Sequence, residues 1–204
     1  MSDFEVLRNS LFKIRCSIFL FKAFTMTFNS TILIHPGLGN SGPAHWQSLW
    51  EKQFNFVRIE QQDWETPVCN DWITTLNGYV QQYDPKNVIL VGHSLACSTI
   101  VYWAQQYNVN IKGALLVAPS DTEADTYPEG TSGFTPVPLI KLPFKSITIA
   151  SSNDYYVTSE RARLFANSWG SELVEIGDAG HINLASGFGE WPQGLELLKQ
   201  LDNL

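Results

Sequence analysis

Cysteine and histidine are scarce in this sequence of 204 residues. The three cysteines, Cys16, Cys69 and Cys97, are an odd number at wide spacing without a CxxC pair, which argues against a disulfide framework or a structural zinc site. The four histidines form no HxH or HxxxH cluster, so no metal site is predicted. Cysteines that are not paired favour a reducing compartment, and we expect a cytoplasmic protein.

Clusters of positive charge and long hydrophobic runs are also lacking. The net charge of −7 repels phosphate backbones and anionic lipid, so neither nucleic acid nor a membrane is expected as a partner. The apolar stretch at residues 10–24 is interrupted by three basic residues and lacks the uninterrupted centre of a secretory signal. It is either an amphipathic extension or a segment that precedes a natural start at Met26. We favour the start at Met26. We therefore place residues 1–26 outside the fold.

From Thr27 onward, strand-like and helix-like segments alternate, and residues 87–91 form a continuous apolar run of the kind that parallel sheets bury on both faces. Strands are predicted at 31–35, 56–60, 87–91, 114–117, 147–150 and 173–176. Helices are predicted at 44–54, 70–83 (capped by Asn70 or Asp71), 96–107, 159–169 and 194–201. This alternation indicates one α/β domain at 27–204 with a mainly parallel, doubly wound sheet. Residues 122–142 form a long loop without periodicity.

A serine lies at the junction of the strongest strand and the following helix, in the sequence GHSLA at residues 92–96. This arrangement is typical of the nucleophile elbow of α/β-hydrolases, whose tight turn needs small residues two positions before and after the serine. Gly92 meets that need, and Ala96 departs from the strict pattern by one methyl group. Ser94 is therefore the predicted nucleophile, and the Leu95 N–H at the helix start is a predicted oxyanion donor.

A glycine-rich loop, HPGLGNSG at residues 35–42, follows the first predicted strand. The α/β-hydrolase fold takes its other oxyanion N–H from a loop in this position, and we assign it to Leu38. The alternative is a nucleotide-binding loop, since Gly37, Gly39 and Gly42 have the spacing of GxGxxG. No acidic residue follows about 20 positions later at a second strand end, which disfavours that alternative.

An acid and a histidine follow the last two predicted strands. Asp154 lies beyond the fifth strand and His181 beyond the sixth. The order serine, acid, histidine is the one that α/β-hydrolases use, and a serine hydroxyl needs both an adjacent base and a group that orients that base. Asp121 and Asp178 are rival acids, and Asp154 could instead cap the next helix.

Several segments are specific enough to indicate a family. They are HPGLGNSGPAHWQ at 35–47, QDW at 62–64, GHSL at 92–95, AGHIN at 179–183 and SGFGEWP at 186–192. From about residue 27 to the end, the chain resembles the small serine hydrolases of the retinoblastoma-binding-protein-nine and YdeN type, in their bacterial branch. The resemblance implies a Ser94–Asp154–His181 triad, an α/β-hydrolase fold without a large lid domain, and no cofactor.

One departure from that family concerns its protein partner. The Leu-x-Cys-x-Glu motif linked to retinoblastoma binding is represented here only by LACST at residues 95–99, which lacks the glutamate. A retinoblastoma-type partner is therefore not predicted.

The predicted activity is hydrolysis of small carboxylic esters or related acyl bonds through an acyl-enzyme. Candidate pocket residues, each of which could instead belong to the core, are His35, Trp64, Phe134, Tyr155 and Trp191. The alternative function is a catalytically silent protein-interaction module that keeps the fold. The sequence leaves the natural substrate and the oligomeric state open.

Overall fold

The computed structural model describes residues 26–204 and contains a six-stranded, fully parallel sheet. Its strands are β1 (Thr31–His35), β2 (Val57–Arg58), β3 (Val88–His93), β4 (Gly113–Val117), β5 (Lys145–Ala150) and β6 (Glu172–Glu175). Their order across the sheet is β2-β1-β3-β4-β5-β6. The chain thus winds outward to β2 and then crosses back, which puts the switch point between β1 and β3. The predicted α/β fold class is confirmed.

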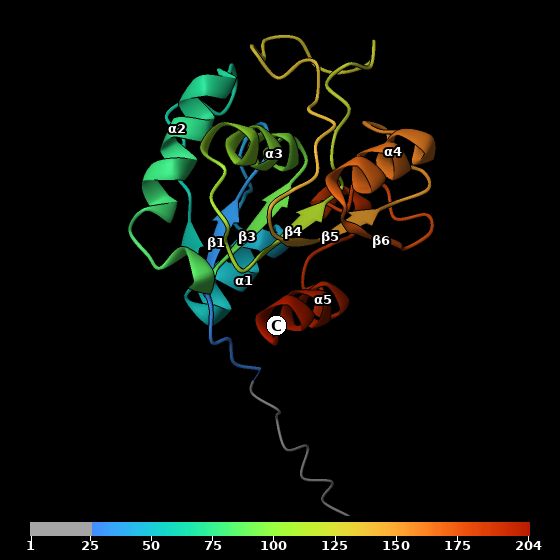
Figure 1. The fold of residues 1–204 in the computed structure, drawn as a ribbon. Helices are drawn as coiled ribbons and strands as arrows, with labels where there is room; N and C mark the ends of the chain where they lie inside the picture. The colour runs from blue at the N-terminus through green and yellow to red at the C-terminus, as the bar shows by residue number, and fades with distance from the viewer. Residues whose placement is uncertain (1–25) are drawn as a thin grey trace, which may run out of the picture.

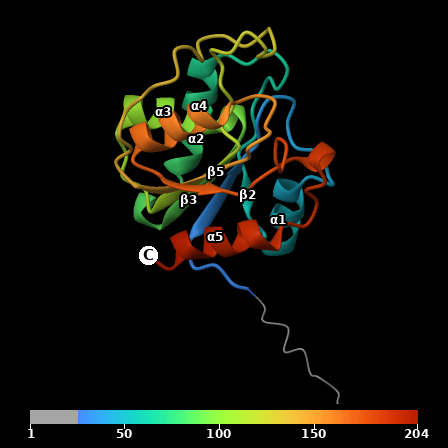
Figure 2. The ribbon, with the colours of Figure 1, turned by 90° about the vertical axis from the view of Figure 1, so that its right-hand side faces the viewer.

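Five α-helices cover the two faces of the sheet (Figures 1 and 2). They are α1 (Trp46–Phe54), α2 (Cys69–Val80), α3 (Leu95–Tyr107), α4 (Ser159–Trp169) and α5 (Pro192–Asp202). Helices α2, α3 and α4 lie on one face, and α1 and α5 lie on the other. Two single-turn 3₁₀ helices complete the structure, η1 (Pro85–Asn87) and η2 (Leu184–Ser186).

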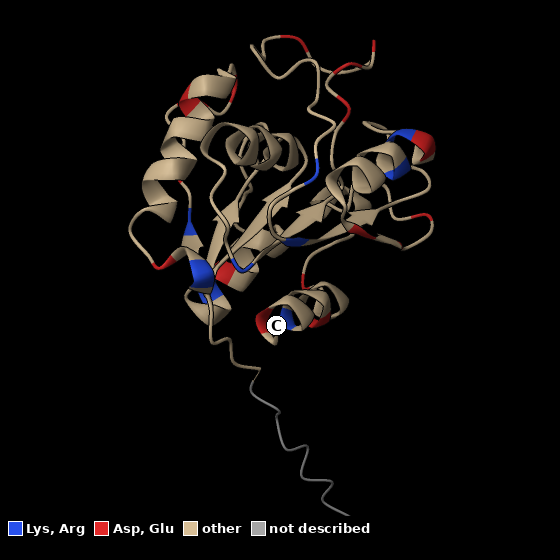
Figure 3. Ribbon diagram, in the orientation of Figure 1, with Lys and Arg blue, Asp and Glu red and all other residues tan. Residues whose placement is uncertain are grey.

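The core is divided into two layers by the alternation of strand side chains. Leu90 and Leu116 pack beneath α2, α3 and α4, whereas Val91 and Val117 pack against α1 and α5. Strands β3 and β4 contain no charged residue, and Figure 3 shows the charged residues mainly on the outer helices and loops. These two strands therefore form a rigid apolar base beneath the loops at their carboxyl ends.

The start of α2 differs from the prediction. Its N-cap is Val68, which makes no side-chain cap hydrogen bond, and neither Asn70 nor Asp71 caps the helix. Instead the Cys69 N–H donates to the Ser132 carbonyl at 2.8 Å. A backbone acceptor from a distant loop thus satisfies a helix-end donor that a capping side chain would otherwise bind.

The long loop between β4 and β5 contains no helix or strand other than an isolated bridge between Val68 and Ser132. It is nevertheless packed onto the domain, because Phe134 is 1% exposed in the core and the Thr122 hydroxyl donates to the Phe134 carbonyl at 2.6 Å. No large lid is present in the part of the chain that the structure describes. Within the same residues, no helix is long and apolar enough to cross a membrane.

Candidate active site

Ser94 lies on the turn between β3 and α3 with φ 57° and ψ −122°, in a backbone region that favours glycine. A Cβ atom on Gly92 would lie 2.7 Å from Ile100 Cδ1 and 3.2 Å from the Ala96 carbonyl carbon, so no larger residue fits there. The Ser94 N–H donates to the Val117 carbonyl at 3.0 Å, which fixes the turn to the end of β4. The geometry is that of a nucleophile elbow.

The glycine-rich loop after β1 lies directly against this elbow. A Cβ atom on Gly37 would lie 2.7 Å from the His93 carbonyl oxygen and 2.8 Å from Ser94 Cβ. Only glycine allows this approach, which brings the following residue, Leu38, to the wall of the cavity at Ser94. The N–H groups of Leu38 and Leu95 donate to no protein acceptor within residues 26–204.

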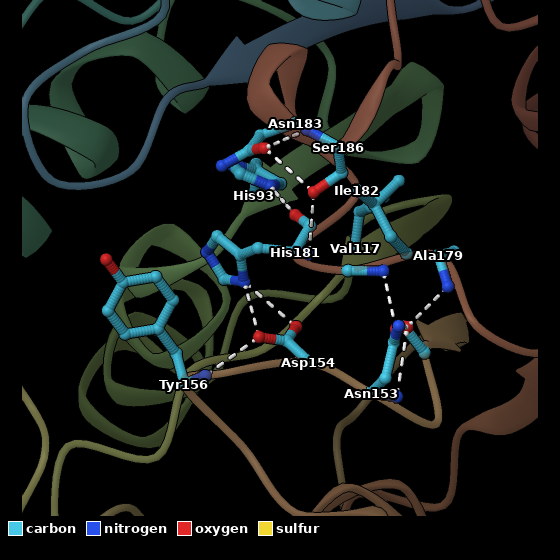
Figure 4. Close-up of polar contacts among 12 residues, drawn as sticks. His93, Val117, Asn153, Asp154, Tyr156, Ala179, His181, Ile182, Asn183 and Ser186 are labelled. Carbon is cyan, nitrogen blue, oxygen red and sulfur yellow. Dashed lines mark hydrogen bonds and ion pairs between the residues drawn. The ribbon is translucent and has the colours of Figure 1, made fainter.

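Asp154 and His181 meet on the loops that follow β5 and β6 (Figure 4). His181 Nδ1 lies 2.9 Å from both Asp154 carboxylate oxygens. The Asp154 side chain is 0% exposed, and its Oδ1 also accepts the Tyr156 N–H at 2.9 Å. A buried carboxylate in this position holds the Nδ1 proton on the histidine and leaves Nε2 free to accept another.

A further hydrogen-bond network joins the two loops that carry Asp154 and His181. Asn153 Oδ1 accepts the Gly180 N–H at 2.7 Å and the Ser151 hydroxyl at 2.8 Å. The Ser151 oxygen accepts the Ala179 N–H at 2.9 Å. These contacts, visible in part in Figure 4, restrain the separation of the acid and the histidine.

The two rival acids have other partners. Asp121 forms a bidentate ion pair with Arg161, at 2.7 and 2.8 Å. Asp178 accepts the Ser152 hydroxyl at 2.6 Å near the surface. Neither contacts His181 among the described residues.

Three histidines pack in a row beside Ser94, a feature that the sequence prediction missed. The ring centroids of His45 and His93 are 5.0 Å apart, and those of His93 and His181 are 4.9 Å apart. His93 Nε2 donates to the His181 carbonyl at 2.9 Å. Burial lowers the pKa of His45 to about 4 and holds that of His93 well below its usual range. Both rings are therefore neutral at pH 7.

Ser94 and His181 both line a cavity of about 190 Å³. The other residues that line it are Leu38, Asn40, His45, His93, Tyr127, Pro128, Tyr156 and Asn183. No hydrogen bond joins the Ser94 hydroxyl to His181 in residues 26–204, and such contacts are often long in an enzyme without substrate. One signal in the sequence indicates this lining, because Asn40, His45 and Asn183 belong to the segments that carry the family resemblance.

Two of the predicted pocket residues are buried behind the cavity rather than in its wall. His35 is 0% exposed and contacts the Pro36 carbonyl and Gln61, and burial lowers its pKa to about 4. Phe134 packs edge-to-face on Trp72 in the core. Both side chains are needed to fill the layer beneath the site, so neither reaches the cavity.

The other three predicted pocket residues also lie outside the cavity. Trp64 packs edge-to-face on Trp72 at the edge of the core. Tyr155 points to solvent with 71% exposure, and its neighbour Tyr156 takes the position against the His181 ring at 4.6 Å. Trp191 lies on the α1–α5 face, at a cleft of about 610 Å³ that none of Ser94, Asp154 and His181 lines.

No group of three histidine, cysteine or carboxylate side chains is arranged to hold a metal ion in the described region. The chemistry available at the cavity is that of a hydroxyl, an imidazole with a buried carboxylate behind it, and free backbone N–H groups. This set suits acyl transfer through a serine.

Comparison with known proteins gives the family. The model of a family described as serine hydrolase matches residues 32–200. Among solved structures, a YdeN-like protein from Pectobacterium atrosepticum is 34% identical with a TM-score of 0.75, covering 85% of this chain and 90% of that one. The ydeN gene product of B. subtilis is 21% identical with a TM-score of 0.75, covering 86% and 100%.

Esterase 2 of Thermogutta terrifontis shares the fold at 17% identity and a TM-score of 0.59, covering 86% of this chain and 83% of that one. No curated protein matches the chain. The family model covers most of the chain, and the YdeN-like relative is similar over nearly its whole length. The chain therefore belongs to the serine hydrolase family, among its YdeN-like hydrolases.

Proposed function

We propose that the protein hydrolyses small carboxylic esters through a triad of Ser94, His181 and Asp154. The observation that carries the proposal is the symmetric contact of Asp154 with His181 Nδ1, at 2.9 Å from each oxygen, beside a serine at an elbow in the same cavity. Burial of the carboxylate supports this role, because an unhydrated anion stabilises the imidazolium that forms during the reaction.

The proposed reaction begins when His181 Nε2 accepts the Ser94 proton as the hydroxyl oxygen attacks the ester carbonyl. The tetrahedral intermediate collapses when the imidazolium gives that proton to the departing alcohol, which leaves an acyl group on Ser94. Water then attacks the acyl-enzyme with His181 again as base, and the carboxylic acid is released. No cofactor takes part in these steps.

The N–H groups of Leu38 and Leu95 are the proposed oxyanion donors. Leu95 is the first residue of α3, where backbone N–H groups have no intrahelical acceptor and the helix dipole is positive. The contact of Gly37 with the elbow supports the second donor, because it brings the Leu38 backbone beside the nucleophile. Two such donors contribute several kcal/mol to transition-state stabilisation.

The small volume of the cavity supports a short acyl group. At about 190 Å³, the cavity is smaller than the roughly 300–1,000 Å³ of pockets that bury drug-sized ligands. A panel of p-nitrophenyl esters should therefore give the highest kcat/KM for short acyl chains and decline as the chain lengthens. A preference for long chains would contradict this part of the proposal.

A fluorophosphonate probe tests the nucleophile. We expect covalent labelling of the wild-type protein and none of Ser94→Ala, with ester turnover lost in the same variant. Labelling of neither protein, with both folded by circular dichroism, would favour the silent interaction module. Labelling of Ser94→Ala would place the nucleophile elsewhere.

We further propose that residues 27–204 form one domain that acts in the cytoplasm on small molecules, without nucleic acid, membrane or retinoblastoma-type partners. The free and buried state of Cys69 and Cys97 supports a reducing compartment. Leu95, Cys97 and Thr99 are each 0% exposed, so this segment of α3 offers no surface to a partner. A chain starting at Met26 should keep the ester turnover of the full chain.

A further inference from the structure

The cavity contains a carboxamide whose orientation is fixed by the protein. Asn40 Oδ1 accepts hydrogen bonds from the Arg58 guanidinium at 2.7 Å and from the Ser41 N–H at 2.7 Å. Because both donors face the oxygen, the amide nitrogen is the atom left for a ligand. Asn40 lines the cavity two residues after Leu38, whose N–H is a proposed oxyanion donor.

A second carboxamide in the lining of this cavity is fixed in the same way. Asn183 caps η2, and its Oδ1 accepts the Ser186 N–H at 3.0 Å and the Ser186 hydroxyl at 3.1 Å. Figure 4 shows the oxygen turned toward Ser186 and the amide nitrogen turned away from it. Asn183 also lines the cavity, two residues after His181.

The third fixed donor is His45. The Gln47 N–H donates to His45 Nδ1 at 3.2 Å, so Nδ1 carries no proton and the neutral ring has its proton on Nε2. No protein acceptor for that N–H is found among residues 26–204. His45 lines the cavity together with the two asparagines.

The same cavity offers little to a charged ligand. Its lining, as far as the structure describes it, includes no carboxylate, although the chain has 20 acidic and 13 basic residues. The nearby charge of Arg58 is balanced by Glu51 at 2.7 Å. A carboxylate would lose its hydration without gaining a free cation, which is costly, whereas an uncharged oxygen would gain hydrogen bonds.

From this arrangement we infer that the preferred substrate is a short, uncharged ester that carries a second hydrogen-bond-accepting oxygen close to the scissile carbonyl. The inference rests on the proposed ester hydrolysis and names the substrate class of that same site. The second oxygen would accept from one or two of three groups, which are the Asn40 NH₂, the Asn183 NH₂ and His45 Nε2–H. Such fixed donors discriminate strongly, because an apolar analogue leaves them unpaired.

The test compares p-nitrophenyl methoxyacetate with p-nitrophenyl butyrate. Their acyl groups have the same number of non-hydrogen atoms and differ only where an ether oxygen replaces a methylene. Each kcat/KM is divided by the rate constant for hydroxide hydrolysis of the same ester, which removes the electronic effect of the ether oxygen. One hydrogen bond of ordinary strength gives a normalised preference of about fivefold for methoxyacetate in the wild type.

Two isosteric variants remove the donors. Asn40→Asp and Asn183→Asp keep the oxygens that bind Arg58, Ser41 and Ser186 but replace each NH₂ group by an acceptor. Each variant should lower the normalised preference, and the double variant should bring it to about one or below. The ratio is insensitive to partial unfolding, because both esters report on the same folded molecules.

The matched control is Asn108→Asp at the C-cap of α3. At 1.5 Å per residue, it lies about 20 Å along the helix from Ser94. It carries the same charge change and should keep the wild-type preference. Equal normalised rates for the two esters in the wild type, or a preference that survives both cavity variants, would overturn the inference.

Failure of the underlying proposal has a different signature. Absence of fluorophosphonate labelling at Ser94 and of turnover on both esters would overturn ester hydrolysis itself, and the inference with it. Labelling with equal turnover of the two esters would overturn only the assignment of the substrate class.

Discussion

Two of the cavities within the described residues differ in size, in the chemistry of their lining and in the backbone around them. The cleft between α1 and α5 encloses about 610 Å³ and is lined by apolar and aromatic side chains such as Trp50, Phe54 and Trp191. The cavity at Ser94 encloses about 190 Å³ and is lined by hydroxyl, imidazole and carboxamide groups. Only the smaller one lies at the carboxyl ends of the strands, next to the switch point between β1 and β3.

The difference separates the volume of a cavity from the reactive groups that line it. The larger cleft lies where helices pack imperfectly over an aromatic cluster, with Trp50 and Trp191 stacked at 5.7 Å. Three features that cost folding free energy lie at or beside the smaller cavity. They are a serine at positive φ, a buried carboxylate and three packed histidines. Such features concentrate at functional sites.

The largest expected effect is on turnover, and it distinguishes Asp154, beside the cavity at Ser94, from the rival acid Asp121. Asp154→Asn should lower kcat/KM about 10³- to 10⁴-fold, because an amide favours the wrong tautomer of His181. Asp121→Asn breaks the ion pair with Arg161 and should lower the free energy of unfolding while leaving turnover per folded molecule unchanged. Steady-state kinetics on active-site-titrated protein measure kcat/KM. Denaturant unfolding measures the free energy of unfolding. Unchanged turnover in Asp154→Asn would refute the acid assignment.

The next prediction tests whether the larger cleft serves stability alone. Trp191 is 4% exposed and contacts Trp46 and Trp50, so Trp191→Ala should lower the free energy of unfolding by about 3–5 kcal/mol. Ester turnover per fluorophosphonate-reactive molecule should stay within about twofold of the wild type. A collapse of turnover with wild-type stability would make the cleft a functional site.

The third prediction concerns pH. Burial lowers the pKa of His35 and His45 from 6.5 to about 4, so between these values the unfolded chain binds more protons than the folded one. The stability associated with these neutral rings is present above pH 6.5 and is lost as the pH falls toward 4. Each histidine accounts for up to about 3 kcal/mol.

Guanidinium unfolding at pH 7.5 and pH 4.5 measures this loss. His45→Asn supplies the control, because asparagine can cap α1 as His45 does but does not titrate. That variant should lose less stability than the wild type over the same interval. An equal loss in both proteins would assign the pH dependence to other groups.

The smallest expected effect tests the contact between the glycine-rich loop and the elbow. Gly37→Ala would bring a methyl group within 2.8 Å of Ser94 Cβ, and we expect a loss of about 1–3 kcal/mol in stability with a measurable fall in turnover. Gly42→Ala in the same loop meets no atom within 4 Å and should be neutral in both assays. Equal behaviour of the two variants would contradict the close approach.

The fold was predictable because its signals are local and strong. Strand β1 and helix α4 have the predicted bounds, Thr31–His35 and Ser159–Trp169, since each combines a clear periodicity with a defined end. Strand β2 was predicted too long, at 56–60, because only Val57 and Arg58 pair with β1. Pairing depends on the partner strand, which periodicity along one segment does not describe.

The candidate triad could be predicted from the order of residues along the chain, but the residues that line the cavity could not. Ser94, Asp154 and His181 come after the parallel strands β3, β5 and β6, so topology brings them to one edge of the sheet. Whether an aromatic residue faces a cavity or the core depends on packing across the whole layer. Tyr155 was predicted and Tyr156 lines the cavity, a difference of one residue that turns the side chain to the other side of the loop.

The conformation of Ser94 has a consequence for how this protein can change. A side chain at φ 57° and ψ −122° costs about 1–3 kcal/mol relative to a relaxed backbone. Ser94→Gly would relieve that strain, so an inactive chain could unfold at a higher denaturant concentration than the active one. Such a variant would separate the stability that this position takes from the fold from the chemistry that the hydroxyl is proposed to supply.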